Sequence, residues 1–276
     1  MIYELIYMKK ALLLIILLIA ALFGCSKTHD EYLSEAKELY KNEEYDKALS
    51  LYNKACEKGS LKGCMFLADV YKKGIVINTD NNTSLNYYKK SFLLANLYCQ
   101  QNIKDACKTL SYLYENGLGT DIDLAKADNA SSKACDLGDA ASCYYQARVN
   151  ADNMTAFILY TDKACQNNMA YACLVLGNTY LTGFNESMAE IEKDIEKGIS
   201  YINKACEMNN EICASLADIY ISGDDLEQDY NTAVIYYKTA LKHYETLCTE
   251  KNDDNPACRN IDVIKSKYSF DNETIY

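Results

Sequence analysis

Hydrophobic residues recur three and four positions apart along most of the chain, in short segments separated by polar turns. Residues 31–58 contain this spacing twice, with a break near Asn42, and therefore predict two amphipathic helices. Farther along, four segments begin with a cysteine and carry Leu at +3, a small residue at +4, Tyr at +7 and Gly at +10. They begin at Cys64, Cys107, Cys173 and Cys213. Because offsets 0, 3, 4 and 7 lie on one helical face, each segment predicts a helix, which we call helix A, ending at the glycine.

A second helix, helix B, precedes the next copy of helix A and ends in the sequence Lys-Ala-Cys. This ending occurs at Cys56, Cys135, Cys165 and Cys206. In two other repeats Phe92 and Leu241 occupy the place of that cysteine, and the cysteine comes seven residues later. Seven residues make two helical turns, so we expect these two B helices to be extended. Between Cys143 and Cys173 the Tyr-x2-Gly motif is missing, and we expect a shorter loop there.

The second cysteines of successive units, from Cys64 to Cys258, are separated by 43, 36, 30, 40 and 45 residues. Two helices per unit at such a period predict a helical solenoid. With 276 residues, 49% of them hydrophobic, the chain is long enough for a substantial core. Its formal charge of −11 argues against nucleic acid as a partner, because phosphate binding needs a basic surface.

Thirteen cysteines indicate either an oxidising compartment or metal clusters. Zinc sites use C-x2-4-C spacing or histidines, and this chain has wider spacing and only His29 and His243, so we expect no metal and no cofactor. Apart from Cys25, the cysteines fall into six local pairs. These are Cys56 with Cys64, Cys99 with Cys107, Cys135 with Cys143, Cys165 with Cys173, Cys206 with Cys213, and Cys248 with Cys258. Turn residues between the members of most pairs would let the chain reverse and each pair form a disulfide.

The N-terminus predicts an exported protein. Lys9 and Lys10 precede an apolar run, Ala11 to Leu22, that is too short for an ordinary spanning helix and is typical of a signal peptide over residues 1–24. The following Leu22-Phe23-Gly24-Cys25 resembles the lipobox of bacterial lipoproteins, although Phe23 is bulkier than the usual residue. That resemblance implies a lipid on Cys25, a tether over residues 25–30, and a place in the periplasm or outer membrane. The alternative is an ordinary signal peptide, an incidental cysteine and a secreted protein.

The repeat pattern resembles Sel1-like repeats, and more closely the cysteine-rich Sel1-like family, over roughly residues 31–265. The resemblance implies an all-α fold, a right-handed αα superhelix with one disulfide at each repeat junction. The expected domains are a tetratricopeptide-like hairpin at 31–58, five Sel1-like repeats at 59–255, and a capping helix with a tail at 256–276. In the cap, Ile261 and Ile264 should face inward.

Two functions remain open. The first is a scaffold that binds a protein, a peptide or a cell-envelope ligand, with the membrane reached only through the lipid anchor. Positions +1 and +5 of helix A share a face outside the core stripe and would line the concave side. They are Met65 and Asp69, Lys108 and Tyr112, Tyr144 and Arg148, Leu174 and Asn178, and Ala214 and Asp218.

The alternative function rests on the family resemblance, which implies a penicillin-binding protein or β-lactamase acting on β-lactams or peptidoglycan fragments. Ser34-Glu35-Ala36-Lys37 matches the S-x-x-K motif of serine enzymes of that kind. The companion motifs S-D-N and K-T-G are absent from the sequence, and chance matches to S-x-x-K are expected in a chain this rich in serine and lysine. No catalytic residue is therefore assigned.

Overall fold

The structure is a computed structural model that describes residues 27–186, 189–223, 226–248 and 255–267. The chain divides into two compact units, one of residues 1–97 and 116–122 and the other of residues 98–115 and 123–276. The predicted signal peptide and the predicted lipid site Cys25 lie outside the described residues. None of the helices within the described ranges combines the length and apolar character needed to cross a bilayer.

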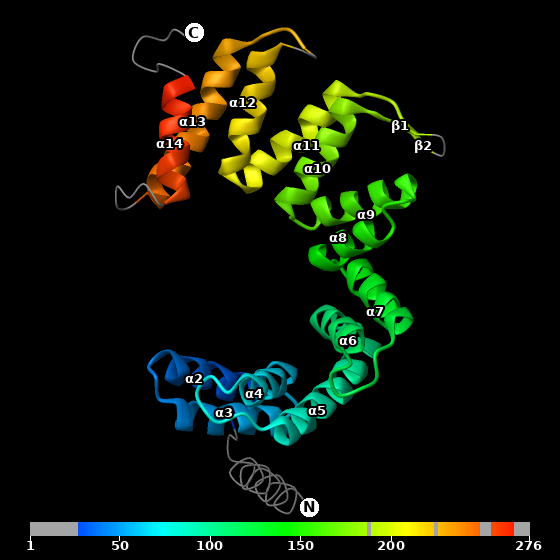
Figure 1. Cartoon of the computed structure of the whole chain (residues 1–276), viewed down its shortest axis with the longest axis vertical. Coiled ribbons are helices and arrows are strands. Elements are labelled where there is room, and N and C mark those ends of the chain that lie inside the picture. Colours follow the sequence, from blue (N-terminus) through cyan, green and yellow to red (C-terminus); the bar gives the residue numbers. More distant parts are fainter. Residues whose placement is uncertain (1–26, 187–188, 224–225, 249–254, 268–276) are drawn as a thin grey trace, which may run out of the picture. The chain divides into compact units, whose positions relative to one another are not determined.

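The first unit consists of helical hairpins (Figure 1). Its helices are α2 (His29–Lys41), α3 (Tyr45–Glu57), α4 (Leu61–Lys73) and most of α5 (Asn81–Gln100). Helices α2 and α3 are the two amphipathic helices expected around Asn42. Helix α2 begins within residues 25–30, the range predicted as a tether, because Thr28 caps it. Its hydroxyl accepts the Glu31 N–H at 3.3 Å, and its own N–H donates to the Glu31 carboxylate at 2.6 Å, so the helix begins at His29.

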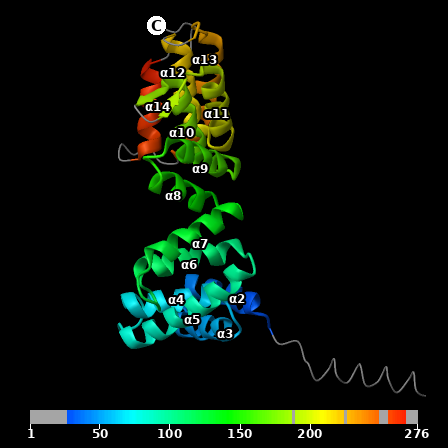
Figure 2. The ribbon, with the colours of Figure 1, turned by 90° about the vertical axis from the view of Figure 1, so that its right-hand side faces the viewer.

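The second unit continues the same order of hairpins, which both views of the ribbon show (Figures 1 and 2). After the end of α5 it contains α6 (Lys104–Asn116), α7 (Leu124–Asp136), α8 (Ala140–Val149), α9 (Met154–Gln166), α10 (Ala170–Thr182), α11 (Ile195–Met208), the 3-10 helix η1 (Asn210–Ile212), α12 (Cys213–Ser222), α13 (Tyr230–Leu247) and α14 (Pro256–Lys267). Helices α4, α6, α8, α10 and α12 are the A helices, and α3, α5, α7, α9, α11 and α13 are the B helices. The expected all-α repeat fold stapled by disulfides is confirmed.

The offsets within helix A have the structural meaning that the sequence indicated. Leu67, Leu176 and Leu216 at +3 are buried together with the cysteines, and the glycine at +10 directly follows α4, α6, α10 and α12. The carbonyl of the tyrosine at +7 accepts a hydrogen bond from the N–H of the aspartate at the N-terminus of the next B helix. These bonds join Tyr71 to Asp80, Tyr114 to Asp123, Tyr180 to Asp194, and Tyr220 to Asp229, at 2.9–3.0 Å. Each such bond closes the loop between helices A and B.

All six cysteine pairs form disulfides in the predicted local pairing. Their Cα atoms lie 4.5–5.1 Å apart, which is possible because the chain reverses between the two cysteines. The first five disulfides each join the end of a B helix to the following A helix, and Cys248–Cys258 joins the end of α13 to α14. The disulfides are therefore the corners between repeats, and most of their sulfurs are fully buried.

The irregular repeats also follow the sequence, with one addition. Helices α5 and α13, predicted to be extended, have 20 and 18 residues, against 13 in α3, α7 and α9. In α14, Ile264 is buried and Ile261 packs against the same cluster, as expected. The addition is a short antiparallel hairpin, β1 (Phe184–Glu186) and β2 (Ala189–Ile191), inserted in the loop before α11. The sequence pattern did not predict these strands.

Candidate functional site

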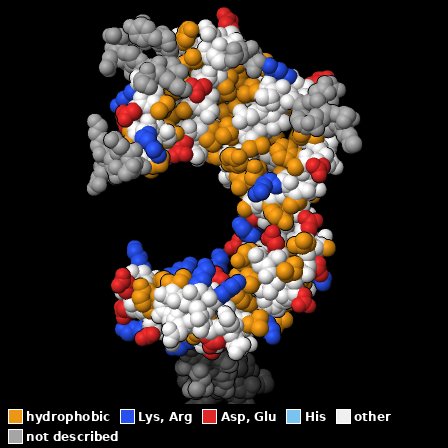
Figure 3. Space-filling view, viewed as in Figure 1, with side chains coloured by type: hydrophobic (Ala, Val, Ile, Leu, Met, Phe, Trp, Pro, Cys, Tyr) orange, Lys and Arg blue, Asp and Glu red, His pale blue; other side chains and the backbone are white. Residues whose placement is uncertain are grey.

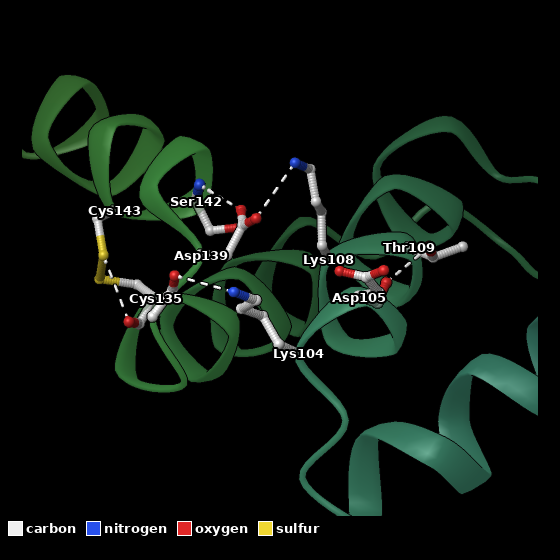
Figure 4. Close-up of polar contacts among 9 residues, drawn as sticks. Lys104, Asp105, Lys108, Thr109, Cys135, Asp139, Ser142 and Cys143 are labelled. Carbon is white, nitrogen blue, oxygen red and sulfur yellow. Dashed lines mark hydrogen bonds and ion pairs between the residues drawn. A yellow bond between two sulfur atoms is a disulfide. The ribbon is translucent and has the colours of Figure 1, made fainter. Parts of the chain in front are cut away.

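The predicted binding residues of the second unit lie on α6, α8, α10 and α12, and we call the surface formed by their +1 and +5 positions the helix-A face. On α6 and α8 this face meets a polar cluster at the turn that holds the Cys135–Cys143 disulfide (Figure 4). Lys108 on α6 donates to the Asp139 carboxylate at 3.3 Å, and Lys104, one turn earlier, donates to the Gly138 carbonyl at 3.3 Å. Two lysines of one repeat thus bind the corner of the next.

Asp139 is the centre of this cluster because it begins α8. One of its carboxylate oxygens accepts both the Ser142 N–H at 2.8 Å and the Ser142 hydroxyl at 2.7 Å. Burial opposes ionisation of Asp139. The hydrogen bonds from Ser142 and the charge of Lys108 outweigh that effect and hold the pKa of the carboxyl below its ordinary value. Asp139 is therefore an anion at neutral pH, and Lys108, which we expected to meet a ligand, already has a partner.

A small pocket of about 190 Å³ opens between α6 and α8, beside this cluster. Its walls include Lys108, Tyr112 and Glu115 from α6 and Ser142 and Tyr145 from α8. Small-molecule sites usually have roughly 300–1,000 Å³. A volume below that range suits one side chain of a bound peptide better than a drug-sized ligand.

Exposed aromatic side chains follow the pocket toward α10. Tyr112 is 47% exposed and Tyr171 is 57% exposed, although large apolar rings usually avoid water. The Tyr144 ring meets Tyr171 edge to face, with ring centroids 5.6 Å apart. Burial and the neighbouring Tyr171 raise the pKa of Tyr144, while the positive charge of Arg148 opposes that rise. Tyr112, Tyr144, Tyr171 and Arg148 thus combine exposed rings with a cation.

Other predicted binding residues already have structural roles. The hydroxyl of Tyr88 on α5 donates to Asp69, and the hydroxyl of Tyr237 on α13 donates to Asp218. Both aspartates stand at +5 and hold the B helix of their own repeat. Leu174 and Ala214 pack against buried clusters, Met65 is half-buried, and Asn178 is exposed. Not all of the predicted binding residues are therefore available to a partner. In the second unit, the exposed aromatic and basic residues among them lie on α6 and α8.

Two residues of this surface were missed. Tyr171 stands at −2 and Tyr145 at +2 relative to the second cysteine of their repeats. Positions −2, +1, +2 and +5 share one side of a helix, so extending the stripe by one turn toward the N-terminus would have found Tyr171.

Two serines in the described part of the chain bear on the β-lactamase alternative. Ser34 and Lys37, which match S-x-x-K, are exposed on α2. Ser142 donates its hydroxyl to a carboxylate whose pKa is lowered, and such a carboxylate is a weak base. Within the described ranges, no group of three or more His, Cys, Asp or Glu side chains is placed to hold a metal ion.

Fold and surface together define a helical-repeat scaffold protein. The chain matches the family model described as Sel1 repeat at residues 35–60, 61–96, 105–127, 163–210 and 213–243, which is more than half of its length. The chain therefore belongs to the Sel1 repeat family. Sel1 repeats form a scaffold fold, and proteins that contain them generally bind protein partners. The unmatched stretch from 128 to 162 includes the shortened loop without Tyr-x2-Gly.

Curated relatives include two assembly factors. Cytochrome c oxidase assembly factor 7A of Xenopus laevis is 29% identical over 182 residues, which cover 60% of this chain and 72% of that protein. Cytochrome c oxidase assembly factor 7 of Xenopus tropicalis is 29% identical over 163 residues, which cover 52% of this chain and 69% of that protein.

Two solved structures share the fold. A Sel1 repeat protein from Oxalobacter formigenes is 18% identical, has a TM-score of 0.56, and is matched over 85% of this chain and 99% of that one. The protein c5321 of uropathogenic Escherichia coli, described as a protective antigen with an SLR fold, is 21% identical with a TM-score of 0.54. The match covers 87% of this chain and about half (49%) of that protein.

Proposed function

We propose that this protein is an exported scaffold that binds an extended segment of a partner protein along the helix-A face from α6 to α10. The observation that carries the proposal is the exposure of Tyr112, in the wall of the pocket between α6 and α8, and of Tyr171 on α10, whose ring contacts Tyr144 on α8. Tyrosine and arginine are the residue types that contribute most to protein interfaces, because each combines a large apolar surface with hydrogen-bonding groups. Arg148 supplies the guanidinium between them.

The shape of the surface favours an extended ligand. Successive A helices present the same positions in register, so a chain that crosses them meets Tyr112, then Tyr144 and Arg148, then Tyr171. Figure 3 shows hydrophobic side chains gathered over α8 to α12 of the second unit. The small pocket then receives one side chain of the bound segment, and Glu115 in its wall offers an acceptor.

Export is supported by the disulfides. Six disulfides in one chain are typical of oxidising compartments, because cytosolic thiols are kept reduced. We extend the proposal to a lipid anchor on Cys25 and a location in the bacterial cell envelope, in agreement with the lipobox-like sequence. The two curated relatives are named as assembly factors, and assembling a complex requires contact with other proteins.

The test begins with a photo-reactive phenylalanine derivative at position 112 and, as a control, at position 159. Leu159 is 52% exposed on α9, a B helix, so it reports contacts away from the helix-A face. A partner cross-linked from 112 and not from 159 is then purified, and its affinity for the intact protein is measured by calorimetry.

The combined variant Tyr112→Ala, Arg148→Ala and Tyr171→Ala should weaken that affinity about tenfold or more. Its thermal midpoint should stay near that of the wild type, because the three side chains are exposed or at the rim. The matched control, Leu159→Ala with Tyr230→Ala, removes exposed apolar surface from B helices and should bind like the wild type. Unchanged binding by the triple variant would refute the proposal.

A further inference from the structure

Helix α13 carries a second surface that the helix-A face does not include. A depression of about 590 Å³ lies along α13 beside η1. Its walls include Ile235, Lys238, Lys242 and His243 from α13 and Asn210 from η1. Positions 235, 238 and 242 follow one another at helical spacing, so they form a stripe, which we call the α13 basic face.

The charges on this stripe have no partner within the described part of the chain. Lys238 and Lys242 are exposed and one turn apart, a spacing at which like charges repel. Two other lysines of this unit are paired. Lys126 lies 2.8 Å from the Asp123 carboxylate, and Lys163 lies 2.8 Å from the Asp136 carboxylate. In a chain with a formal charge of −11, an acid-free depression with two unpaired ammonium groups is a local exception.

A carboxylate of η1 near the depression faces another residue. Glu211 of η1 is directed to His243, with 3.8 Å between its Oε1 and the histidine Nε2. Glu211 is thus engaged at the edge, and the depression between Lys238 and Lys242 keeps its positive charge.

The walls of the depression beside the two lysines are largely apolar in character. Ile235 is 63% exposed. The hydroxyls of Thr239 and Thr246 donate to carbonyls of their own helix, at 2.9 and 2.7 Å, so neither requires a polar partner from outside. The lysine stems add methylene groups, because only their ends need water. The surface therefore offers two cations, with the exposed apolar residue Ile235 one turn before the first of them.

We propose that the α13 basic face binds an acidic segment of a partner protein, in which one apolar side chain stands beside a pair of carboxylates. The carboxylates would pair with Lys238 and Lys242, and the apolar side chain, at the end of the segment next to Lys238, would cover Ile235. Charge complementarity selects this partner, since the depression is basic within an acidic protein and its walls are largely apolar. The site is independent of the helix-A face, because it lies on a B helix.

The probe is a short fluorescein-labelled peptide in which one leucine stands beside two glutamates, and binding to the intact protein is followed by fluorescence anisotropy. We expect affinity to fall with added salt, and Lys238→Glu with Lys242→Glu to weaken it about tenfold or more. Ile235→Ser should weaken binding of this peptide but not of a version with serine in place of leucine. The helix-A variants Tyr112→Ala and Arg148→Ala should leave it unchanged, which separates this proposal from the first.

The matched control is Lys37→Glu with Lys41→Glu, an exposed lysine pair one turn apart on α2. It makes the same change of net charge and should bind like the wild type, and circular dichroism should show that every variant is folded. Equal loss in the control pair would mean that only net charge matters and would overturn the proposal. So would binding of anionic phosphatidylglycerol vesicles, and not of the peptide, through Lys238 and Lys242, and so would the absence of any peptide binding.

Discussion

The Tyr201 hydroxyl on α11 donates a hydrogen bond of 2.8 Å to the Asp162 carboxylate on α9, the B helix of the preceding repeat. Two other repeats form the same bond in register, from Tyr87 to Asn53 at 2.8 Å and from Tyr236 to Asn203 at 2.9 Å. Each donor ring also stacks on the +7 tyrosine of its own repeat, with centroids 5.8–5.9 Å apart. Stacking joins helices A and B, and the hydrogen bond joins consecutive repeats.

Removing the hydroxyl tests how much this bond stabilises the stack of repeats. Tyr201→Phe keeps the ring and loses a bond to a charged acceptor, so it should lower the free energy of unfolding by about 1–2 kcal/mol. Tyr236→Phe loses a bond of nearly the same length to a neutral amide and should lower it by about 0.5–1 kcal/mol. Urea unfolding measures both. A larger effect at Tyr236 than at Tyr201 would contradict the role given to the Asp162 charge.

The same residue predicts how stability depends on alkaline pH. Burial, followed by the hydrogen bond to Asp162, raises the pKa of Tyr201 above its ordinary value. Above about pH 10 the unfolded chain loses this proton while the folded chain still holds it, so stability falls as pH rises. Tyr201→Phe should show a shallower fall in the urea midpoint between about pH 9 and about pH 11 than the wild type. An equal slope would mean that Tyr201 does not contribute.

Much of this architecture could be read from the sequence, because cysteine, leucine, tyrosine and glycine stand at fixed offsets from one another. The seven-residue delay of Cys99 and Cys248 was enough to predict the long α5 and α13. The bond from Tyr201 to Asp162 could not be predicted in this way. It joins different repeats, 39 residues apart, and its acceptor alternates between Asn and Asp.

The candidate site, too, could be predicted from the sequence only in part. Helical spacing placed Lys108 and Asp218 on one kind of face, but spacing does not tell which groups already have partners. In the structure Lys108 donates a hydrogen bond to Asp139, and Asp218 accepts one from the Tyr237 hydroxyl. The inserted hairpin could have been detected from the length of its loop. The hydrogen bond that closes this loop, between Tyr180 and Asp194, spans 14 positions, and the corresponding bonds of the other three loops span nine.

Two glycines with left-handed backbone conformations predict different responses to alanine. At Gly119, with φ of +74°, an added Cβ would lie 2.4 Å from the backbone carbonyl of Tyr88. At Gly138, with φ of +86°, it would meet only the side-chain oxygen of Asn167, at 2.9 Å, which can move away. Gly119→Ala should lower stability by about 2–4 kcal/mol and Gly138→Ala by about 1–2 kcal/mol. Thermal unfolding measures the stability of both variants. A larger loss for Gly138→Ala than for Gly119→Ala would show that the α5 backbone can move away from the added methyl group.

The ionisation of Asp139 predicts how the stability of the protein changes at acidic pH. Burial acts against its charge, but Ser142 and Lys108 lower its pKa overall. A lowered pKa in the folded state stabilises the protein above about pH 4, and this contribution is lost as pH falls through the folded pKa. Asp139→Asn can still cap α8 but has no charge, so it should lose less stability than the wild type between about pH 5 and about pH 3.

Asp139→Ala is the control for the cap itself. It removes the acceptor of the Ser142 N–H as well as the charge, and should lower stability at neutral pH by about 1 kcal/mol. If Asp139→Asn kept the full acid dependence of the wild type, other carboxylates would have to carry it. The next residues to substitute are then the N-cap residues Asp80, Asp123 and Asp229. Hydrogen bonds from the first turn of their own helices lower the pKa values of these carboxyls as well.

The disulfide between Cys206 and Cys213 tests whether stability in this chain is local. Its Cα atoms are 4.7 Å apart at the corner between α11 and α12, and closing so short a loop contributes about 2.5 kcal/mol on the chain-entropy model. Replacing both cysteines by alanine should therefore lower stability by about 2–4 kcal/mol, including the loss of buried sulfur. Because each repeat of a solenoid contacts only its neighbours, amide hydrogen exchange should accelerate in α11 and α12 and stay unchanged in α2 to α4. The matched variant at Cys248 and Cys258 should expose α14 and the end of α13 instead. Accelerated exchange throughout the chain in either variant would show that the repeats unfold as a single cooperative unit.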